Sequence, residues 1–259
     1  MTATSIHTPR GEMPLYVATP AGPGPWPGVV VIHAALGMSR DVRAHAQWLA
    51  SEGFLAVAPD LFYWGKRSRC LFALMRGWMP GSELDATRQW LVAHPQCTSR
   101  IGVIGFCMGG GFALAVAADH DFDAASVNYG GLTREVERSL PHACPIVGSF
   151  GDKDRWPGVR GVPDRIEPIL DAAGIDHDIK VYPGAGHGYV SHTPCQSGSC
   201  PHPPDPSTDS GFPARGGRSA TPYAARCAHG NRAVRVGRAR RGSRGPEPDH
   251  PTRGATPRP

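Results

Sequence analysis

A cysteine flanked by glycines lies between an apolar segment and an alanine-rich one. Cys107 stands in Gly105-Phe-Cys-Met-Gly109, the spacing glycine–any–nucleophile–any–glycine. This spacing is typical of a sharp strand-to-helix turn that lifts a nucleophile out of the sheet edge, where the glycines leave room for neighbouring backbone. The positive end of the following helix favours the thiolate. The segment therefore predicts Cys107 as a nucleophile, in preference to a buried structural cysteine on a glycine-rich turn.

A carboxylate and a histidine follow in the chain order nucleophile, acid, base. Asp152 and Asp154 come directly after the apolar run Pro145–Phe150, and His187 lies in the glycine-rich segment Gly184–Gly188. We expect His187 to be the general base, with Asp154 holding its imidazole in the correct tautomer and Asp152 as the second choice. The predicted chemistry is acyl transfer through a thioester. We expect it to use no metal and no organic cofactor.

Acyl transfer also needs donors for the oxyanion that develops at the substrate carbonyl. The backbone N–H of Met108, at the start of the helix after Cys107, is the first candidate. The second is the N–H of Ala35, in the loop after the apolar run Gly28–His33. We therefore predict an oxyanion hole made of these two backbone groups.

Alternating strand and helix patterns must position these residues. They predict a doubly wound, mostly parallel α/β sheet, in which ligands bind beyond the carboxyl ends of the strands. Ser82 is the predicted N-cap of its helix, with Asp85 in the capping-box position. Residues 60–80 are irregular and are interpreted as a loop with short helices. The predicted strands are Leu15–Ala18, Gly28–His33, Phe54–Ala58, Arg100–Phe106, Ala124–Asn128, Pro145–Phe150 and Asp178–Tyr182, and the predicted helices are Asp41–Ser51, Ser82–His94, a helix after Cys107 to about Ala118, and Pro163–Ala173.

The charge is unevenly distributed along the 259 residues. The whole chain carries a formal +5, but residues 193–259 hold 11 Arg, no Lys and 4 Asp+Glu, a net +7, so residues 1–192 carry −2. A near-neutral body indicates neither a nucleic-acid nor a membrane partner. The chain has no apolar run of about 18 residues and no secretory pattern near its start. Its seven scattered cysteines favour a reducing compartment, so we expect a cytoplasmic protein.

The composition changes at about residue 193. Residues 193–259 contain no Leu or Ile but 12 Pro and 9 Gly, so we interpret 1–192 as the folded domain and 193–259 as a disordered tail. A second hypothesis is that the tail is translated from a shifted reading frame. A third, less favoured, is a zinc- or RNA-binding appendage. Its candidate groups are Cys195, Cys200, His202, Cys227, His229 and the arginine-rich run Arg232–Arg244.

Over roughly residues 10–192 the sequence resembles the dienelactone hydrolase family. The matching segments are Val29–His33 with Gly37, Ala58–Leu61, Gly105–Gly110, Gly151–Asp154 and Gly184–His187. The resemblance implies an α/β-hydrolase fold, a Cys107–His187–Asp154 triad and a carboxylic ester hydrolase acting on an ester or lactone, like carboxymethylenebutenolidase. The cysteine in the glycine-flanked turn is its most specific part, since most α/β-hydrolases carry serine there.

The sequence departs from the family at three positions where charged residues are expected. Ala34 replaces a Glu that helps to ionise the thiol, while Trp64 and Ser191 replace arginines that bind a substrate carboxylate. These departures weigh against dienelactone itself as the substrate. Trp64, Arg67 and Trp156 are the candidate substrate-binding residues, with a more apolar acyl or ring substrate.

The family's closing amphipathic helix is not found after His187. The alternative hypothesis is therefore a non-catalytic protein of this fold that binds a small ligand. We expect a monomer or a weak homo-oligomer.

Overall fold

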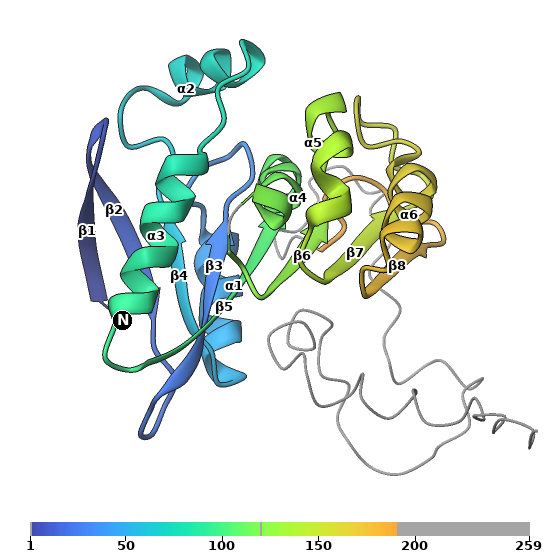
Figure 1. The fold of residues 1–259 in the computed structure, drawn as a ribbon. Coiled ribbons are helices and arrows are strands. Elements are labelled where there is room, and N and C mark those ends of the chain that lie inside the picture. Colours follow the sequence, from blue (N-terminus) through green and yellow to red (C-terminus); the bar gives the residue numbers. More distant parts are fainter. Residues whose placement is uncertain (1, 120, 191–259) are drawn as a thin grey trace, which may run out of the picture. The chain divides into compact units, whose positions relative to one another are not determined.

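One mixed sheet of eight strands organises the protein. The computed structural model describes residues 2–119 and 121–190. The strand order is β1-β2-β4-β3-β5-β6-β7-β8, in which β1–β2 and β2–β4 are antiparallel and all other pairs are parallel (Figure 1). The strands are β1 (Thr2–Thr8), β2 (Gly11–Ala18), β3 (Trp26–Ile32), β4 (Leu55–Pro59), β5 (Cys97–Phe106), β6 (Ala124–Asn128), β7 (Ile146–Gly151) and β8 (His177–Tyr182).

Helices cover both faces of this sheet, which confirms the predicted doubly wound α/β architecture. In Figure 1, α3 and α4 lie in front of the sheet and α1 lies behind it. The helices are α1 (Arg40–Ser51), α2 (Arg67–Met75), α3 (Gly81–Ala93), α4 (Met108–Asp119), α5 (Arg134–Ser139) and α6 (Val162–Ala173), with a 3₁₀ turn η1 (Leu140–His142).

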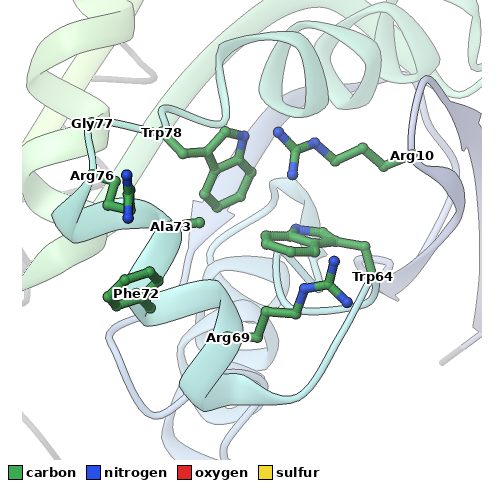
Figure 2. Close-up of a pocket in the computed structure, with 8 residues that line it drawn as sticks. All are labelled: Arg10, Trp64, Arg69, Phe72, Ala73, Arg76, Gly77 and Trp78. Atoms are coloured by element: carbon green, nitrogen blue, oxygen red, sulfur yellow. The ribbon is translucent and has the colours of Figure 1, made fainter.

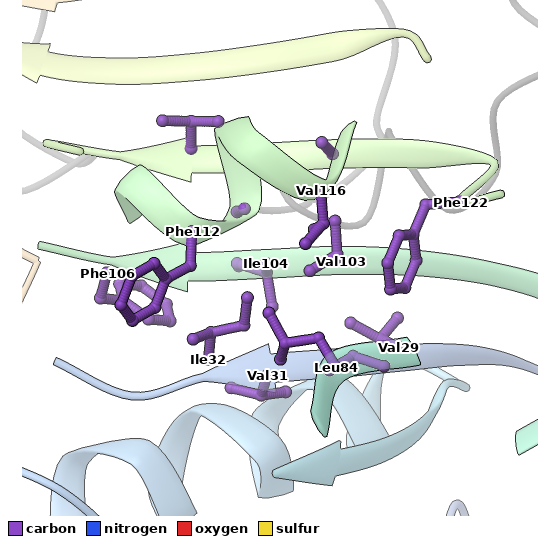
Figure 3. Close-up of a cluster of buried hydrophobic side chains, with 14 of the residues drawn as sticks. Val29, Val31, Ile32, Leu84, Val103, Ile104, Phe106, Phe112, Val116 and Phe122 are labelled. Atoms are coloured by element: carbon purple, nitrogen blue, oxygen red, sulfur yellow. The ribbon is translucent and has the colours of Figure 1, made fainter. Parts of the chain in front are cut away.

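The core explains why the central strands are continuous apolar runs. The Val30, Val31 and Ile32 side chains of β3 and all five residues of β4 are buried, as expected for parallel strands covered on both faces. Phe112 and Val116 of α4 pack on this layer (Figure 3). The well-packed centre fixes the carboxyl ends of β3, β5 and β7, where the predicted chemical groups follow.

Three local features differ from the sequence-based expectations. Strand β1 is absent from the predicted strands, because it has no continuous apolar run and is held by pairing with β2 from Thr2↔Val17 to Thr8↔Gly11. The predicted Ser82 N-cap is wrong: α3 begins at Gly81, and the Ser82 hydroxyl donates to Glu83 Oε2 instead. Helix α5, capped by the Thr133 side chain, was also missed, since its six residues show too short an apolar period.

The segment after β4 is ordered as a turn followed by α2, in agreement with the expectation of short helices between residues 60 and 80. Within the described residues, none of the helices combines the length and apolar character that crossing a bilayer requires. The predicted tail, residues 193–259, lies outside the described residues, as do all candidate zinc ligands and arginines named for it.

Candidate active site

Strand β5 turns into α4 at Cys107, and the backbone there is strained. Cys107 has φ 56°, a left-handed conformation that non-glycine residues seldom adopt and that is often found at functional sites. A Cβ on Gly105 would lie 1.9 Å from the Gly109 carbonyl oxygen, and one on Gly109 would lie 2.5 Å from the Ile32 carbonyl oxygen. The flanking glycines therefore allow the turn to close and α4 to begin against the end of β3.

The Cys107 sulfur, the His187 imidazole and the Asp154 carboxylate form one continuous chain of contacts. His187 Nε2 lies 3.0 Å from Cys107 Sγ, and His187 Nδ1 lies 2.8 Å from Asp154 Oδ2. These three side chains come from the ends of β5, β7 and β8, which parallel pairing brings to one edge of the sheet. The arrangement has the contacts of a nucleophile, a base and an orienting acid.

Burial and a backbone hydrogen bond hold the Asp154 carboxylate in place beside the imidazole. Its side chain is 4 % exposed, and its second oxygen, Oδ1, accepts a 2.9 Å hydrogen bond from the Trp156 backbone N–H. Asp152, the alternative acid, instead accepts a 2.7 Å hydrogen bond from the Gly184 N–H. The structure therefore brings Asp154, rather than Asp152, to His187, while Asp152 ties the two loops together.

The surroundings of His187 favour its protonated form. Burial lowers the pKa of the imidazole, but the hydrogen bonds to Cys107 and Asp154 and their negative charges outweigh burial. The His187 pKa therefore lies above its ordinary value of 6.5. The Trp156 indole stacks on the ring at 4.9 Å between centroids and 15° between planes, and Tyr129 meets it edge-on at 5.2 Å. A histidine held in this way keeps its second proton to a higher pH than a free imidazole does.

Two aromatic residues next to the imidazole differ in exposure. Tyr129 is buried, has φ 41°, and has a raised pKa, first because of burial and then because of the charge of Cys107. Trp156 is 57 % exposed, so one predicted substrate-binding residue does lie against the triad. No sequence pattern distinguishes Tyr129, because a tyrosine after a buried strand is ordinarily a core residue.

A buried histidine connects the two loops that follow β3 and β4. His33 is fully buried, its Nε2 accepts a 3.0 Å hydrogen bond from the Leu61 N–H, and its Nδ1 lies 2.8 Å from the Ala34 carbonyl oxygen. Burial lowers the pKa of His33. A neutral imidazole with its proton on Nδ1 satisfies both contacts. It fixes the loop that contains Ala35, and its role was not foreseen because a histidine ending a strand has no fixed meaning.

The proposed oxyanion donors lie at the matching element ends. Met108 is the first residue of α4, where a backbone N–H has no acceptor within its own helix. Ala35 is half-buried in the loop after β3, whose last carbonyl oxygens lie against the first turn of α4. The assignment of these two N–H groups as oxyanion donors stays a prediction.

Trp64 and Arg67 are placed differently from Trp156. Trp64 lines a separate pocket with Arg10 and Trp78, and Arg67 is exposed at the start of α2. Their assignment to substrate binding stays a prediction. Among residues 2–119 and 121–190, no cluster of three His, Cys, Asp or Glu side chains could hold a metal ion.

Comparison with known proteins identifies the family of this chain. The sequence pattern described as "Dienelactone hydrolase family" matches residues 13–200. A protein from Escherichia coli (strain K12), provisionally named a carboxymethylenebutenolidase, is 30% identical over 208 residues, which cover 72% of this chain and 76% of that protein. A protein from Yersinia pestis with the same provisional name is 29% identical over 208 residues, covering 72% and 77%.

A solved structure shares the fold. It is that of a provisionally named dienelactone hydrolase from Klebsiella pneumoniae, with a TM-score of 0.65 at 27% sequence identity, covering 73% of this chain and 87% of the other. This chain therefore belongs to the dienelactone hydrolase family and has the α/β-hydrolase fold.

Proposed function

We propose that this protein hydrolyses a carboxylic ester or lactone, with Cys107 as nucleophile, His187 as general base and acid, and Asp154 as the orienting carboxylate. The observation that carries the proposal is the continuous contact from sulfur to imidazole to carboxylate, at 3.0 and 2.8 Å. Family membership and the carboxymethylenebutenolidase names of the relatives support the substrate class.

The first half-reaction acylates the sulfur. The Cys107 thiolate attacks the carbonyl carbon, and the carbonyl electron pair moves onto oxygen, where the N–H groups of Met108 and Ala35 stabilise the charge. When the tetrahedral intermediate collapses, the carbon–oxygen ester bond breaks and the leaving oxygen takes the proton from His187 Nε2. The products of this step from an ester are an alcohol and a thioester on Cys107; from a lactone, the new alcohol stays attached to the acyl group of the thioester.

The second half-reaction releases the acid. His187 takes a proton from a water molecule, the resulting hydroxide attacks the thioester carbonyl, and the carbon–sulfur bond breaks to return the thiolate. Asp154 keeps the Nδ1 proton in place, so that Nε2 faces the sulfur in both steps. The raised pKa of His187 supports an imidazolium that can give its Nε2 proton to the leaving oxygen.

A short chromogenic ester, 4-nitrophenyl acetate, tests the proposal. The full chain is expected to turn it over, and to form a thioester at Cys107 that mass spectrometry detects after rapid acid quench. Cys107→Ala and His187→Ala are expected to lose about 10³-fold or more in kcat/KM. Cys97→Ser, at a half-buried cysteine of β5, is the matched control and should retain activity.

Two outcomes contradict the proposal. One is a well-folded wild-type protein that releases no nitrophenol from this ester or from a small lactone, which would leave a ligand-binding role. The other is turnover that survives Cys107→Ala, which would assign the nucleophile elsewhere.

A further inference from the structure

A pocket lies between the β1–β2 turn and the segment that contains α2. It has a volume of about 550 Å³, within the range of small-molecule sites. Figure 2 shows Arg10 reaching from the β1–β2 turn toward the indoles of Trp64 and Trp78. We call it the arginine–tryptophan pocket; its lining is Arg10, Trp64, Arg69, Phe72, Ala73, Arg76, Gly77 and Trp78. No triad residue belongs to this lining.

All charged residues of the lining are cationic. Arg10 Nε lies 3.7 Å from the Oε1 of Glu83, a buried residue behind the pocket, so its charge is partly offset. Arg69 and Arg76 are exposed, and within residues 2–119 and 121–190 no carboxylate lies at ion-pair distance from either of them. Two guanidinium groups are therefore left to attract an anion.

Aromatic rings stand next to each guanidinium. Arg10 Cζ is 4.7 Å from the Trp64 ring centroid and 4.9 Å from that of Trp78, and the two indoles meet edge-on at 5.4 Å. Arg69 Cζ is 5.9 Å from the Trp64 ring, and Arg76 Cζ is 5.4 Å from Phe72. Cation–π contact orders the arginines while their N–H donors stay available to an acceptor such as a carboxylate.

We propose that the arginine–tryptophan pocket binds a planar aromatic anion, such as an aryl carboxylate, at a site separate from the triad. The ring of the ligand packs among Trp64, Phe72 and Trp78, its carboxylate accepts hydrogen bonds from Arg69, and the charge of Arg76 on the other side of Phe72 adds to the attraction. Binding in this pocket needs no reaction at Cys107, so this proposal can be tested independently of the proposed hydrolysis.

Calorimetric titration of the full chain with 2-naphthoate tests the proposal, with 2-naphthamide as the uncharged match. Naphthoate is expected to bind, and the amide to bind about tenfold more weakly or worse. Arg69→Gln and Arg76→Gln, singly and together, are expected to weaken naphthoate binding, the double variant by about tenfold or more. Arg160→Gln, at an exposed arginine outside the pocket, should leave binding unchanged. Raised salt should weaken it.

The indole N–H resonances in a proton–nitrogen spectrum locate the ligand. The signal lost in Trp64→Phe is expected to be the one that shifts most with naphthoate. Absence of binding at millimolar naphthoate, equal binding by the double variant and wild type, or equal binding of acid and amide would overturn the proposal. So would a shift of only the signal lost in Trp156→Phe, because it would place the ligand at the triad.

Discussion

Asp152 accepts a hydrogen bond from the backbone N–H of Gly184 at 2.7 Å, and in this way it joins the loop after β7 to the loop after β8. Two residues further on, Asp154 contacts His187 itself at 2.8 Å. The two carboxylates of this turn therefore have different contacts. Asp152 holds the loop that contains His187, and Asp154 contacts the imidazole.

This division of work predicts unequal effects of matched substitutions. Asp154→Asn should lower kcat/KM for 4-nitrophenyl acetate by about 10³- to 10⁴-fold, because an amide cannot keep the His187 proton on Nδ1. Asp152→Asn keeps an oxygen for the Gly184 N–H and should lose less than about tenfold. Steady-state kinetics on both variants decides the point; equal losses would contradict the assignment of Asp154.

A Gly→Ala substitution beside Cys107 should destabilise the protein far more than the same substitution at a glycine with space around it. Gly105→Ala places a Cβ within 1.9 Å of the Gly109 carbonyl oxygen, whereas Gly186→Ala meets no atom within 4 Å. Overpacking against backbone should destabilise Gly105→Ala by about 3 kcal/mol or more, and so lower Tm by several degrees. Thermal denaturation followed by circular dichroism measures both, and a normal Tm for Gly105→Ala would contradict the close approach.

Removal of the His33 imidazole should affect both stability and catalysis. His33→Leu leaves the buried Leu61 N–H without its acceptor, at a cost of about 1–3 kcal/mol. It also frees the loop of Ala35, so kcat should fall more than KM rises. Urea denaturation and steady-state kinetics test the two effects, with His142→Leu, at an exposed position, as the control. A loss of stability with unchanged kcat would contradict the role of His33 in positioning the Ala35 N–H.

The raised pKa of His187 links stability to pH. The folded protein holds this proton more tightly than the unfolded chain, so the contribution to stability is complete below the unfolded pKa of about 6.5 and is lost as pH rises through the higher folded pKa. The difference in unfolding free energy between wild type and His187→Gln should therefore shrink as pH rises above about 6.5. A difference that grows over this range would contradict the direction of the shift.

Trp156 should influence the choice of substrate. Its exposed indole stacks on the His187 imidazole and offers an apolar surface beside that ring. Trp156→Ala should raise KM for 4-nitrophenyl benzoate by several-fold relative to 4-nitrophenyl acetate, since burial of one aromatic ring contributes on the order of 1 kcal/mol here. An equal change of KM for both esters would remove Trp156 from the acyl-binding surface.

The sequence by itself determined the architecture and the composition of the candidate site. The apolar runs that became β3 and β4 are buried on both faces, and such runs alternating with helical periods leave few other ways to bury that surface. Gly105 and Gly109 predict the turn at Cys107, because the close approach of neighbouring backbone leaves no room for a side chain at either position. Strand β1 escaped prediction since edge pairing with β2, rather than an apolar pattern, holds it in place.

Only the tertiary structure decided which groups meet. Cys107 and His187 are 80 residues apart, and Asp154 and His187 are 33 apart. The choice of Asp154 over Asp152, the stacking of Trp156 on the imidazole, and the turn of Trp64 toward Arg10 all depend on side-chain direction at loop ends. Local sequence sets neither that direction nor the spacing between distant loops, because both follow from how the strands pair and pack.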